Sequence, residues 1–142
     1  MSSERDKARD AVNKLNKLTL EGKLAWSITH SHDLSKFQPD RLVGHVYEAK
    51  YKDNVLRLYK MKMKVEVARR PVLGLSGFIQ SEPEVTWSDQ VFLEMVDLTG
   101  ITLWMFPQLS ALKDLYSSVS YQVADVKNFL EDILETDEVS AQ

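Results

Sequence analysis

Four groups of residues in this sequence have types and spacings that could do chemistry, and the first is a pair of histidines. His30 and His32 stand two apart in a polar segment, so on an extended chain both imidazoles would project to one side and could share a metal ion, with Asp33 beside them. A closed metal site needs about four ligands, and His45 is the only other histidine. We therefore predict no metal site, with His30 and His32 as the nearest candidates.

The second group is basic. Lys60, Lys62 and Lys64 alternate with apolar residues, so on a strand the three cations share one face, and Arg69 and Arg70 extend the run. Such a row could follow the phosphates of a nucleic acid. Exposed lysines also keep strands from pairing with other chains, and a pI near 5.6 is low for a dedicated nucleic-acid-binding protein. Nucleic-acid binding through these five residues is therefore an alternative function.

The third group is the segment Gly74-Leu75-Ser76-Gly77. Paired glycines can bring the backbone close to a phosphate or to RNA. This segment has no basic residue between its glycines, and Ser76 lacks the spacing of a nucleophile elbow. We interpret the segment as a turn.

The fourth group is the carboxylates around a predicted hairpin, Asp89, Glu94 and Asp97. Paired carboxylates do acid–base chemistry when burial or proximity drives their pKa values apart. Strand alternation sets Glu94 opposite to Leu93 and Met95, which predicts a solvent-exposed side chain. No catalytic triad, zinc-binding helix or calcium loop is present in the sequence. We therefore predict that the chain is not an enzyme and uses no cofactor.

The elements that would position these residues follow from hydrophobic periodicity. Residues 4–20 have helical spacing, with Ser2 or Ser3 as the cap and Gly22 at the end, which predicts a helix. Alternating patterns predict five strands, near residues 24–29, 43–51, 55–67, 85–96 and 101–106, with turns at 52–54 and 97–100 that close two hairpins. The segment 68–84 is too apolar for a linker, and we expect it to fold back on the domain, with or without a short strand of its own.

The same pattern predicts which side chains are buried. On the central strand, alternation assigns Tyr59, Met61 and Met63 to the core and the lysines to solvent. Leu56 and Leu58 fall on the lysine side of this alternation, which either a bulge or a locally covered second face would explain. The large aromatic residues are assigned to the core rather than to a ligand pocket: Trp26, Trp87, Trp104, Phe92, Phe106, Tyr116 and Phe129.

The C-terminal region shows two further apolar stripes of helical spacing. One follows Ser110 and the other begins at Val126, with a break near residues 123–124, which predicts a bent helix or two short helices. The complete prediction is one α+β domain over residues 1–135, followed by a flexible acidic tail over 136–142. It has an N-terminal helix, an antiparallel sheet of about five strands, and the C-terminal helix or helix pair packed on one sheet face.

Composition and charge exclude several classes of protein. The chain has 142 residues and no cysteine, so disulfide scaffolds and thiol chemistry are excluded. No secretory signal and no long apolar run appears, so we expect a soluble, cytoplasmic protein. Residues 1–71 hold 16 basic and 9 acidic side chains, whereas residues 72–142 hold 2 and 12. We expect this split to cancel within one molecule; otherwise it would mark two ends that pair between chains.

Two short segments resemble those of small bacterial proteins of unknown function. The opening runs from Leu18-Thr19 through Gly22-Lys23-Leu24 to Trp26, and the close runs from Leu103-Trp104 and Phe106-Pro107 through Leu112 and Leu115-Tyr116 to Phe129-Leu130. The resemblance implies a helix, an antiparallel sheet and a C-terminal helix. It implies no site residue, because the matching positions are mostly apolar.

These observations favour a non-catalytic protein-interaction or regulatory module that self-associates or binds a protein partner. The absence of a catalytic motif, the abundance of aromatic residues and the opposite charges of the two halves motivate this prediction. Nucleic-acid binding through the lysine row is the first alternative. A small acidic immunity or antitoxin-type protein is a further alternative that the composition permits.

Overall fold

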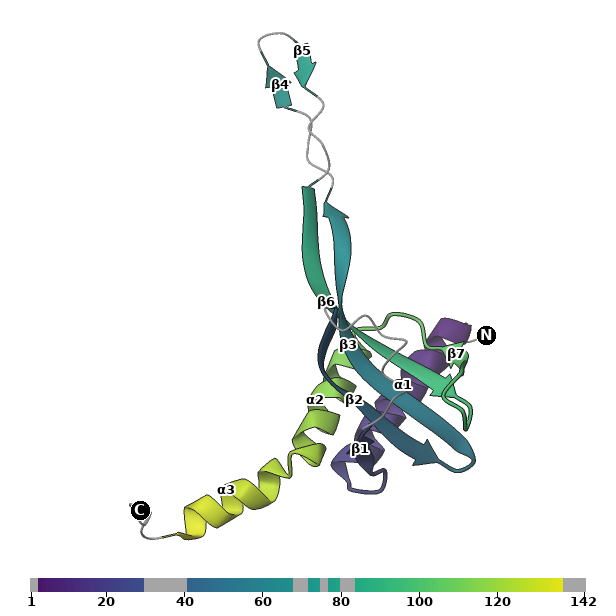
Figure 1. Cartoon of the computed structure of the whole chain (residues 1–142), viewed down its shortest axis with the longest axis vertical. Coiled ribbons are helices and arrows are strands. Elements are labelled where there is room, and N and C mark those ends of the chain that lie inside the picture. Colours follow the sequence, from purple (N-terminus) through teal and green to yellow (C-terminus); the bar gives the residue numbers. More distant parts are fainter. Residues whose placement is uncertain (1–2, 30–40, 68–71, 75–76, 80–83, 137–142) are drawn as a thin grey trace.

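The computed structural model describes residues 3–29, 41–67, 72–74, 77–79 and 84–136 (Figure 1). Its elements are α1 (Glu4–Leu20), β1 (Trp26–Ile28), β2 (Leu42–Tyr51), β3 (Asn54–Val67), β4 (Val72–Gly74), β5 (Gly77–Ile79), β6 (Glu84–Val96), β7 (Thr102–Met105), α2 (Ala111–Val123) and α3 (Val126–Glu135). Five strands form one antiparallel sheet in the order β1-β2-β3-β6-β7, and β4 pairs with β5. The predicted α+β fold is confirmed.

Helix α1 begins and ends at the residues that the sequence predicts. The Ser3 hydroxyl accepts a hydrogen bond from the Asp6 amide at 3.1 Å, and the Asp6 carboxylate accepts one from the Ser3 amide, which forms a capping box. At the other end Gly22 has a φ of +73°, and the Lys23 amide donates to the Leu18 carbonyl at 2.9 Å. This left-handed glycine ends the helix and turns the chain into β1.

The main core lies between one sheet face and the helices α1 and α2. Its buried side chains include Val12, Leu15, Trp26, Tyr47, Leu56, Leu58, Val91, Leu93, Leu112, Leu115 and Val119. The side chain of Gln122 ties α2 to β1, because it accepts from the Trp26 amide and donates to the Leu24 carbonyl, both at 2.8 Å. These contacts fix α2 against the sheet.

The inner half of β3 is covered on both faces, which confirms the predicted burial of Tyr59 and decides for the covered second face as the explanation of Leu56 and Leu58. Leu56 and Leu58, on the lysine side of the alternation, face the helices, whereas Tyr59 is buried on the opposite face with Val46. Alternation separates two faces but does not say which one is covered, and here both faces are. The inner half of the central strand is therefore buried on both sides.

A bulge in β2 marks the place where the sheet narrows. The register between β2 and β3 shifts between Val43 and Tyr47, and Gly44 within the shift has a φ of +72°. A Cβ atom at Gly44 would lie 3.2 Å from the hydroxyl of Tyr116 on α2. Both the left-handed backbone and the close approach of α2 therefore require glycine at this position.

Beyond the end of β2, β3 and β6 continue as a two-stranded ribbon that projects from the rest of the molecule (Figure 1). We call residues 62–67 and 84–89 the arm. Strands β4 and β5 lie at its far end, with Gly74 opposite Gly77, as expected for the interpretation of this segment as a turn. The prediction that residues 68–84 fold back on the domain is wrong for these two strands, because they extend away from it.

Helix α3 projects from the other end of the molecule (Figure 1). Helix α2 ends at Val123, and Asp125 then adopts a left-handed conformation with a φ of +53°, so the predicted break is confirmed. The predicted packing of a C-terminal helix on one sheet face is satisfied by α2, whereas α3 buries none of its residues. In the part of the chain that the structure describes, no helix is long and apolar enough to cross a membrane.

Candidate functional site

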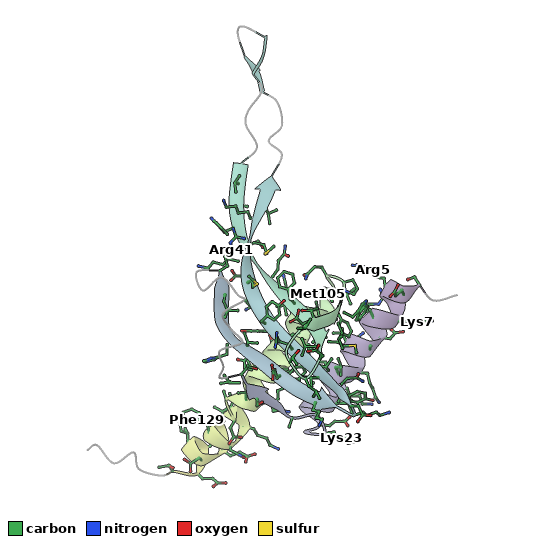
Figure 2. All side chains as sticks on the ribbon, turned by 45° about the vertical axis from the view of Figure 1, so that its right-hand side comes forward. Arg5, Lys7, Lys23, Arg41, Met105 and Phe129 are labelled. Carbon is green, nitrogen blue, oxygen red and sulfur yellow. The ribbon has the colours of Figure 1, made fainter. Side chains whose placement is uncertain are left out.

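The apolar face of α3 is the first candidate surface. Val126, Phe129, Leu130, Ile133 and Leu134 recur at helical spacing and form one stripe along the helix, which we call the α3 stripe. Phe129 is 59% exposed and Leu134 is 83% exposed, and Leu130 and Ile133 are also exposed. Figure 2 shows Phe129 on this helix, away from the sheet. Val126, at the start of the stripe, is half-buried, and the described part of the chain leaves the other four side chains uncovered.

Acidic side chains border the α3 stripe. Successive residues of a helix point about 100° apart, which places Asp132 beside Phe129 on one border and Lys127, followed by Glu131, beside Leu134 on the other. Glu135 adds a third carboxylate, and Lys127 is the only cation of the helix. The exposed helix therefore has one apolar face, and its other faces carry three carboxylates and one cation.

The second candidate surface lies on the arm. Trp87, which is 51% exposed, stands directly across from Lys64 in the register of β3 and β6. The Lys64 ammonium lies 5.3 Å from the Trp87 ring centroid, and the Arg41 guanidinium lies 5.7 Å from it. Both cations therefore interact with the ring.

A hollow of about 410 Å³ opens beside this tryptophan, lined by Arg41, Lys62, Trp87 and Asp89. Lys62 pairs with Asp89 in register, and the Lys62 amide donates to the Arg41 carbonyl at 2.7 Å, so these residues share one end of the arm. Figure 2 shows Arg41 where the arm leaves the sheet. We call Arg41, Lys62, Lys64, Val85, Trp87 and Asp89 the arm face.

The predicted lysine row is divided by the structure. Lys62 and Lys64 are exposed on the arm face, whereas Lys60 is half-buried with its ammonium 4.4 Å from the Tyr116 ring centroid on α2. Arg69 and Arg70 lie outside the described residues. The row contributes two cations to the arm face, and its third cation packs against α2. We call the part of the molecule that surrounds the core, which is the sheet outside the arm with α1 and α2, the body.

Sequence reasoning missed Arg41 and Trp87 at this surface. Arg41 lies far from the lysines in the chain, and Trp87 was assigned to the core. The alternation within β6 does place Trp87 on one face with Asp89 and Val91. Only the cross-strand register, which pairs Lys64 with Trp87, brings the ring to the lysines.

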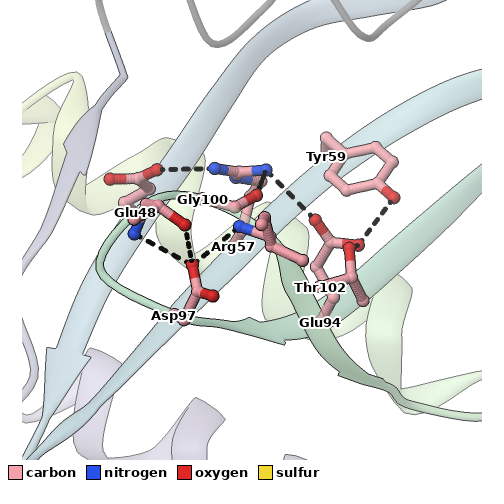
Figure 3. Close-up of polar contacts among 9 residues, drawn as sticks. Glu48, Arg57, Tyr59, Glu94, Asp97, Gly100 and Thr102 are labelled. Carbon is pink, nitrogen blue, oxygen red and sulfur yellow. Dashed lines mark hydrogen bonds and ion pairs between the residues drawn. The ribbon is translucent and has the colours of Figure 1, made fainter.

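A buried ion pair lies inside the body on the sheet face opposite to the helices (Figure 3). Nη1 of Arg57 lies 3.3 Å from Oε1 of Glu94, and both side chains are buried. The Tyr59 hydroxyl and the Thr102 hydroxyl donate to Oε2 of Glu94 at 3.3 and 3.0 Å. The prediction that Glu94 is exposed is wrong, because its carboxylate is buried among Arg57, Tyr59 and Thr102.

The network holds the turn between β6 and β7 against the sheet. Arg57 donates to the Gly100 carbonyl at 3.3 Å and to the Glu48 carboxylate at 3.4 Å (Figure 3). Burial, and then the charge of Glu94, raise the pKa of the Tyr59 hydroxyl above its ordinary value. All charges in the network therefore have partners within the body, as a structural role requires.

The three predicted carboxylates do not form one site. Asp97 closes the turn by accepting from the Thr99 hydroxyl at 2.6 Å and from the Ile101 amide at 2.9 Å, and these bonds lower the pKa of its carboxyl group. Asp89 stands five positions from Glu94 along an extended strand, which separates them by roughly 17 Å. Asp89 lies on the arm surface, Glu94 forms the buried ion pair, and Asp97 closes the turn.

The histidine pair cannot be placed, because His30 and His32 lie outside the described residues. His45 is exposed in the β2 bulge, with its ring 6.3 Å from that of Tyr47. Within the described ranges, no group of three or more histidines, aspartates or glutamates could hold a metal ion.

The aromatic residues divide between the core and the surface. Trp26 and Phe106 are buried as predicted, whereas Trp87, Trp104 and Phe129 are exposed and correct the assignment of all seven to the core. Trp104 lies on the short edge strand β7, whose neighbouring residues Leu103 and Met105 are exposed as well. Edge strand β7 is thus a third apolar surface.

The cations of the arm face and the carboxylates of α3 lie apart in the folded chain. The arm face and α3 project from opposite ends of the molecule (Figure 1). The expectation that the charge split cancels within one molecule is therefore wrong for these two regions, although α1 and α2 do pack together.

Comparisons with known proteins give no relative for this chain: no protein family, no curated protein and no solved structure matches it. The resemblance to small bacterial proteins therefore stays a prediction. The exposed surfaces on α3, the arm and β7 are the features that bear on function.

Proposed function

We propose that this protein is a non-catalytic interaction module that self-associates, and that α3 makes the contact. The observation that carries the proposal is the α3 stripe, of which Phe129, Leu130, Ile133 and Leu134 are exposed and Val126 is half-buried. Covering a large apolar side chain stabilises a protein by about 1.5–3 kcal/mol. A partner surface that covers the stripe would therefore gain substantial binding free energy.

The length of α3 supports the same proposal. It has 10 residues, and isolated helices shorter than about 12–15 residues are marginal in water because nucleation is unfavourable. Most helices in proteins are stabilised by packing of an apolar face, but α3 buries no residue within the described chain. A bound partner supplies the packing that such a helix needs.

The test is sedimentation velocity over a range of protein concentrations at physiological salt. We expect the wild-type protein to associate and the double variant Phe129→Ser/Ile133→Ser to sediment as a monomer. Two apolar contacts of this size correspond to a dissociation constant at least about 100-fold weaker. The thermal unfolding midpoint of the dilute variant should match that of the dilute wild type, because neither residue belongs to the core.

Matched controls are available on other exposed apolar positions. Leu98→Ser, in the 97–100 turn, and Leu103→Ser, on the edge strand β7, should leave association unchanged. Association that survives the α3 double variant but is lost in Leu103→Ser would overturn the proposal and assign the contact to β7. A wild-type protein that stays monomeric at all concentrations would also overturn it.

A second candidate function is single-stranded nucleic-acid binding on the arm face. The observation that favours it is Trp87, which is exposed between Lys64 and Arg41. An exposed ring can stack on a base while neighbouring cations contact phosphates. Binding of a fluorescein-labelled oligothymidylate should then weaken steeply with added salt and in Lys62→Glu/Lys64→Glu. No binding at low salt would remove this candidate.

A further inference from the structure

We infer that the surface that receives α3 is the arm face of a second copy of this chain. The inference rests on the proposed function and names the partner surface for it. Three properties of the two regions support it: their charges, their apolar surfaces and their lengths. Each can be read from the described residues.

Charge is the first property. Among the described side chains, the arm face carries the cations Arg41, Lys62 and Lys64 against the single carboxylate Asp89. Helix α3 carries Glu131, Asp132 and Glu135 against the single cation Lys127. Glu66, which pairs in register with Val85, adds a second carboxylate at the outer end of the arm. Counting Glu66, the arm face therefore has three cations against two carboxylates, and α3 has three carboxylates against one cation, so their net charges are opposite. Complementary potentials of this kind direct association and fix its orientation.

Apolar surface is the second property. The α3 stripe needs an apolar counterpart, and the arm face provides the exposed side chains of Trp87 and Val85. Each surface thus has apolar groups together with charged groups, so the apolar contacts and the charge pairs can form at the same time. Large aromatic side chains such as Trp87 are the residues that most often contribute binding free energy at protein interfaces.

Length is the third property. A helix of 10 residues is about 15 Å long, and six paired positions of a strand extend about 20 Å. Helix α3 can therefore lie along the arm without extending past it. The two regions of one molecule lie at opposite ends, so α3 meets the arm of another copy rather than its own (Figures 1 and 2).

A protein partner fits the arm face better than a nucleic acid does. Asp89 lines the hollow beside Trp87 and pairs in register with Lys62, so it repels a phosphate at the place where the cations gather. The same carboxylate attracts Lys127 of an incoming α3. A nucleic acid would also leave the α3 stripe uncovered.

The test exchanges the charges of the two surfaces in separate proteins. The arm variant is Lys62→Glu/Lys64→Glu, and the helix variant is Glu131→Lys/Asp132→Lys. In either variant alone both surfaces have the same sign, so self-association should weaken by about 10-fold or more. In a 1:1 mixture the acidic arm of one variant meets the basic α3 of the other, and the two unchanged surfaces remain complementary. We expect the mixture to associate about as tightly as the wild type.

Two further measurements complete the design. Trp87→Ala should weaken association while the dilute protein keeps its unfolding midpoint, because Trp87 is outside the core. Added salt should weaken wild-type association, since charge pairs between exposed groups are screened. Association of wild-type strength in both charge variants and in Trp87→Ala would overturn the inference.

The outcomes separate this inference from the proposed function. If Phe129→Ser/Ile133→Ser is monomeric but the charge variants associate as the wild type does, α3 binds a different surface and only the inference fails. If the α3 double variant also associates, the proposed function fails. If Lys62→Glu/Lys64→Glu loses only oligothymidylate binding, the arm is a nucleic-acid surface and the inference is wrong.

Discussion

The inner and outer halves of β3 and β6 belong to the same two strands but have different surroundings. In the inner half, Leu58 and Leu93 are buried against the helices, and Arg57 and Glu94 are buried on the opposite face. In the outer half, beyond the end of β2, the paired residues Lys64 and Trp87 are exposed. The backbone pairing is continuous, so neighbouring elements decide what the strands bury.

The two C-terminal helices repeat this contrast. Both have an apolar stripe, but α2 buries Leu112, Leu115 and Val119 whereas α3 buries none of its residues. We refer below to the arm and α3 as the projections, in contrast to the body. The contrast teaches that the buried contacts of this protein lie in the body, whereas the exposed α3 stripe and the arm face lie on the projections.

The largest expected effect contrasts Arg57 in the body with Lys62 on the arm, both on β3. Arg57→Met leaves the buried carboxylate of Glu94 without its cation, which should lower the free energy of unfolding by about 3–5 kcal/mol. Lys62→Met changes an exposed position and should alter it by less than about 0.5 kcal/mol. Urea denaturation measures both variants. Equal losses would show that the arm is as important to stability as the body is.

The second comparison sets α2 against α3. Leu115→Ala removes a fully buried side chain and should cost about 3 kcal/mol, within the range of leucine truncations in protein cores. Ile133→Ala should cost less than about 0.5 kcal/mol, because Ile133 is exposed. Both measurements require protein dilute enough to be monomeric, since association adds to apparent stability. A large loss in dilute Ile133→Ala would mean that α3 packs on the body.

Much of this architecture could be predicted from the sequence, because it depends on local signals. The cap at Ser3, the left-handed Gly22 and the turns at 52–54 and 97–100 each act over a few residues, and they fix α1 and two hairpins. Alternation likewise placed the long strands. The N-terminal helix, the antiparallel sheet and two C-terminal helices follow from these signals.

The surfaces could not be predicted in the same way, because they depend on which elements lie next to one another. An apolar stripe on a helix has the same pattern in α2 and in α3, and only packing shows that one is covered. Glu94 alternates with apolar residues as an exposed side chain would, yet Arg57 from another strand lies beside it. Trp87 lies beside the lysines because of the register between β3 and β6, which the sequence of neither strand alone specifies.

The third prediction concerns the bulge at which the body ends and the arm begins. Gly44→Ala places a Cβ atom on a left-handed residue, at a cost of about 1–2 kcal/mol, and within 3.2 Å of the Tyr116 hydroxyl. Gly22→Ala is the matched control, because Gly22 is also left-handed but a Cβ there meets no atom within 4 Å. We expect Gly44→Ala to be the more destabilising in urea denaturation. Tyr116→Phe should restore part of the difference.

The smallest effect at neutral pH is expected for Tyr59→Phe in the body, which removes one hydrogen bond to Glu94 at a cost of about 1 kcal/mol. Its diagnostic result is at alkaline pH. Burial, and then Glu94, raise the pKa of Tyr59, so the folded protein keeps a proton that the unfolded chain releases near pH 10. The resulting stability is fully present below about pH 10 and is lost as pH rises toward the folded-state pKa.

The free energy of unfolding, measured from pH 8 to pH 11, should therefore fall less steeply above about pH 10 in Tyr59→Phe than in the wild type. Part of the slope should remain, because burial, followed by Tyr47, also raises the pKa of Tyr116. Tyr121→Phe, at an exposed position on α2, is the matched control and should keep the wild-type slope. Equal slopes for Tyr59→Phe and the wild type would mean that water reaches the network beneath the 97–100 turn, and that this part of the body is as open as the projections.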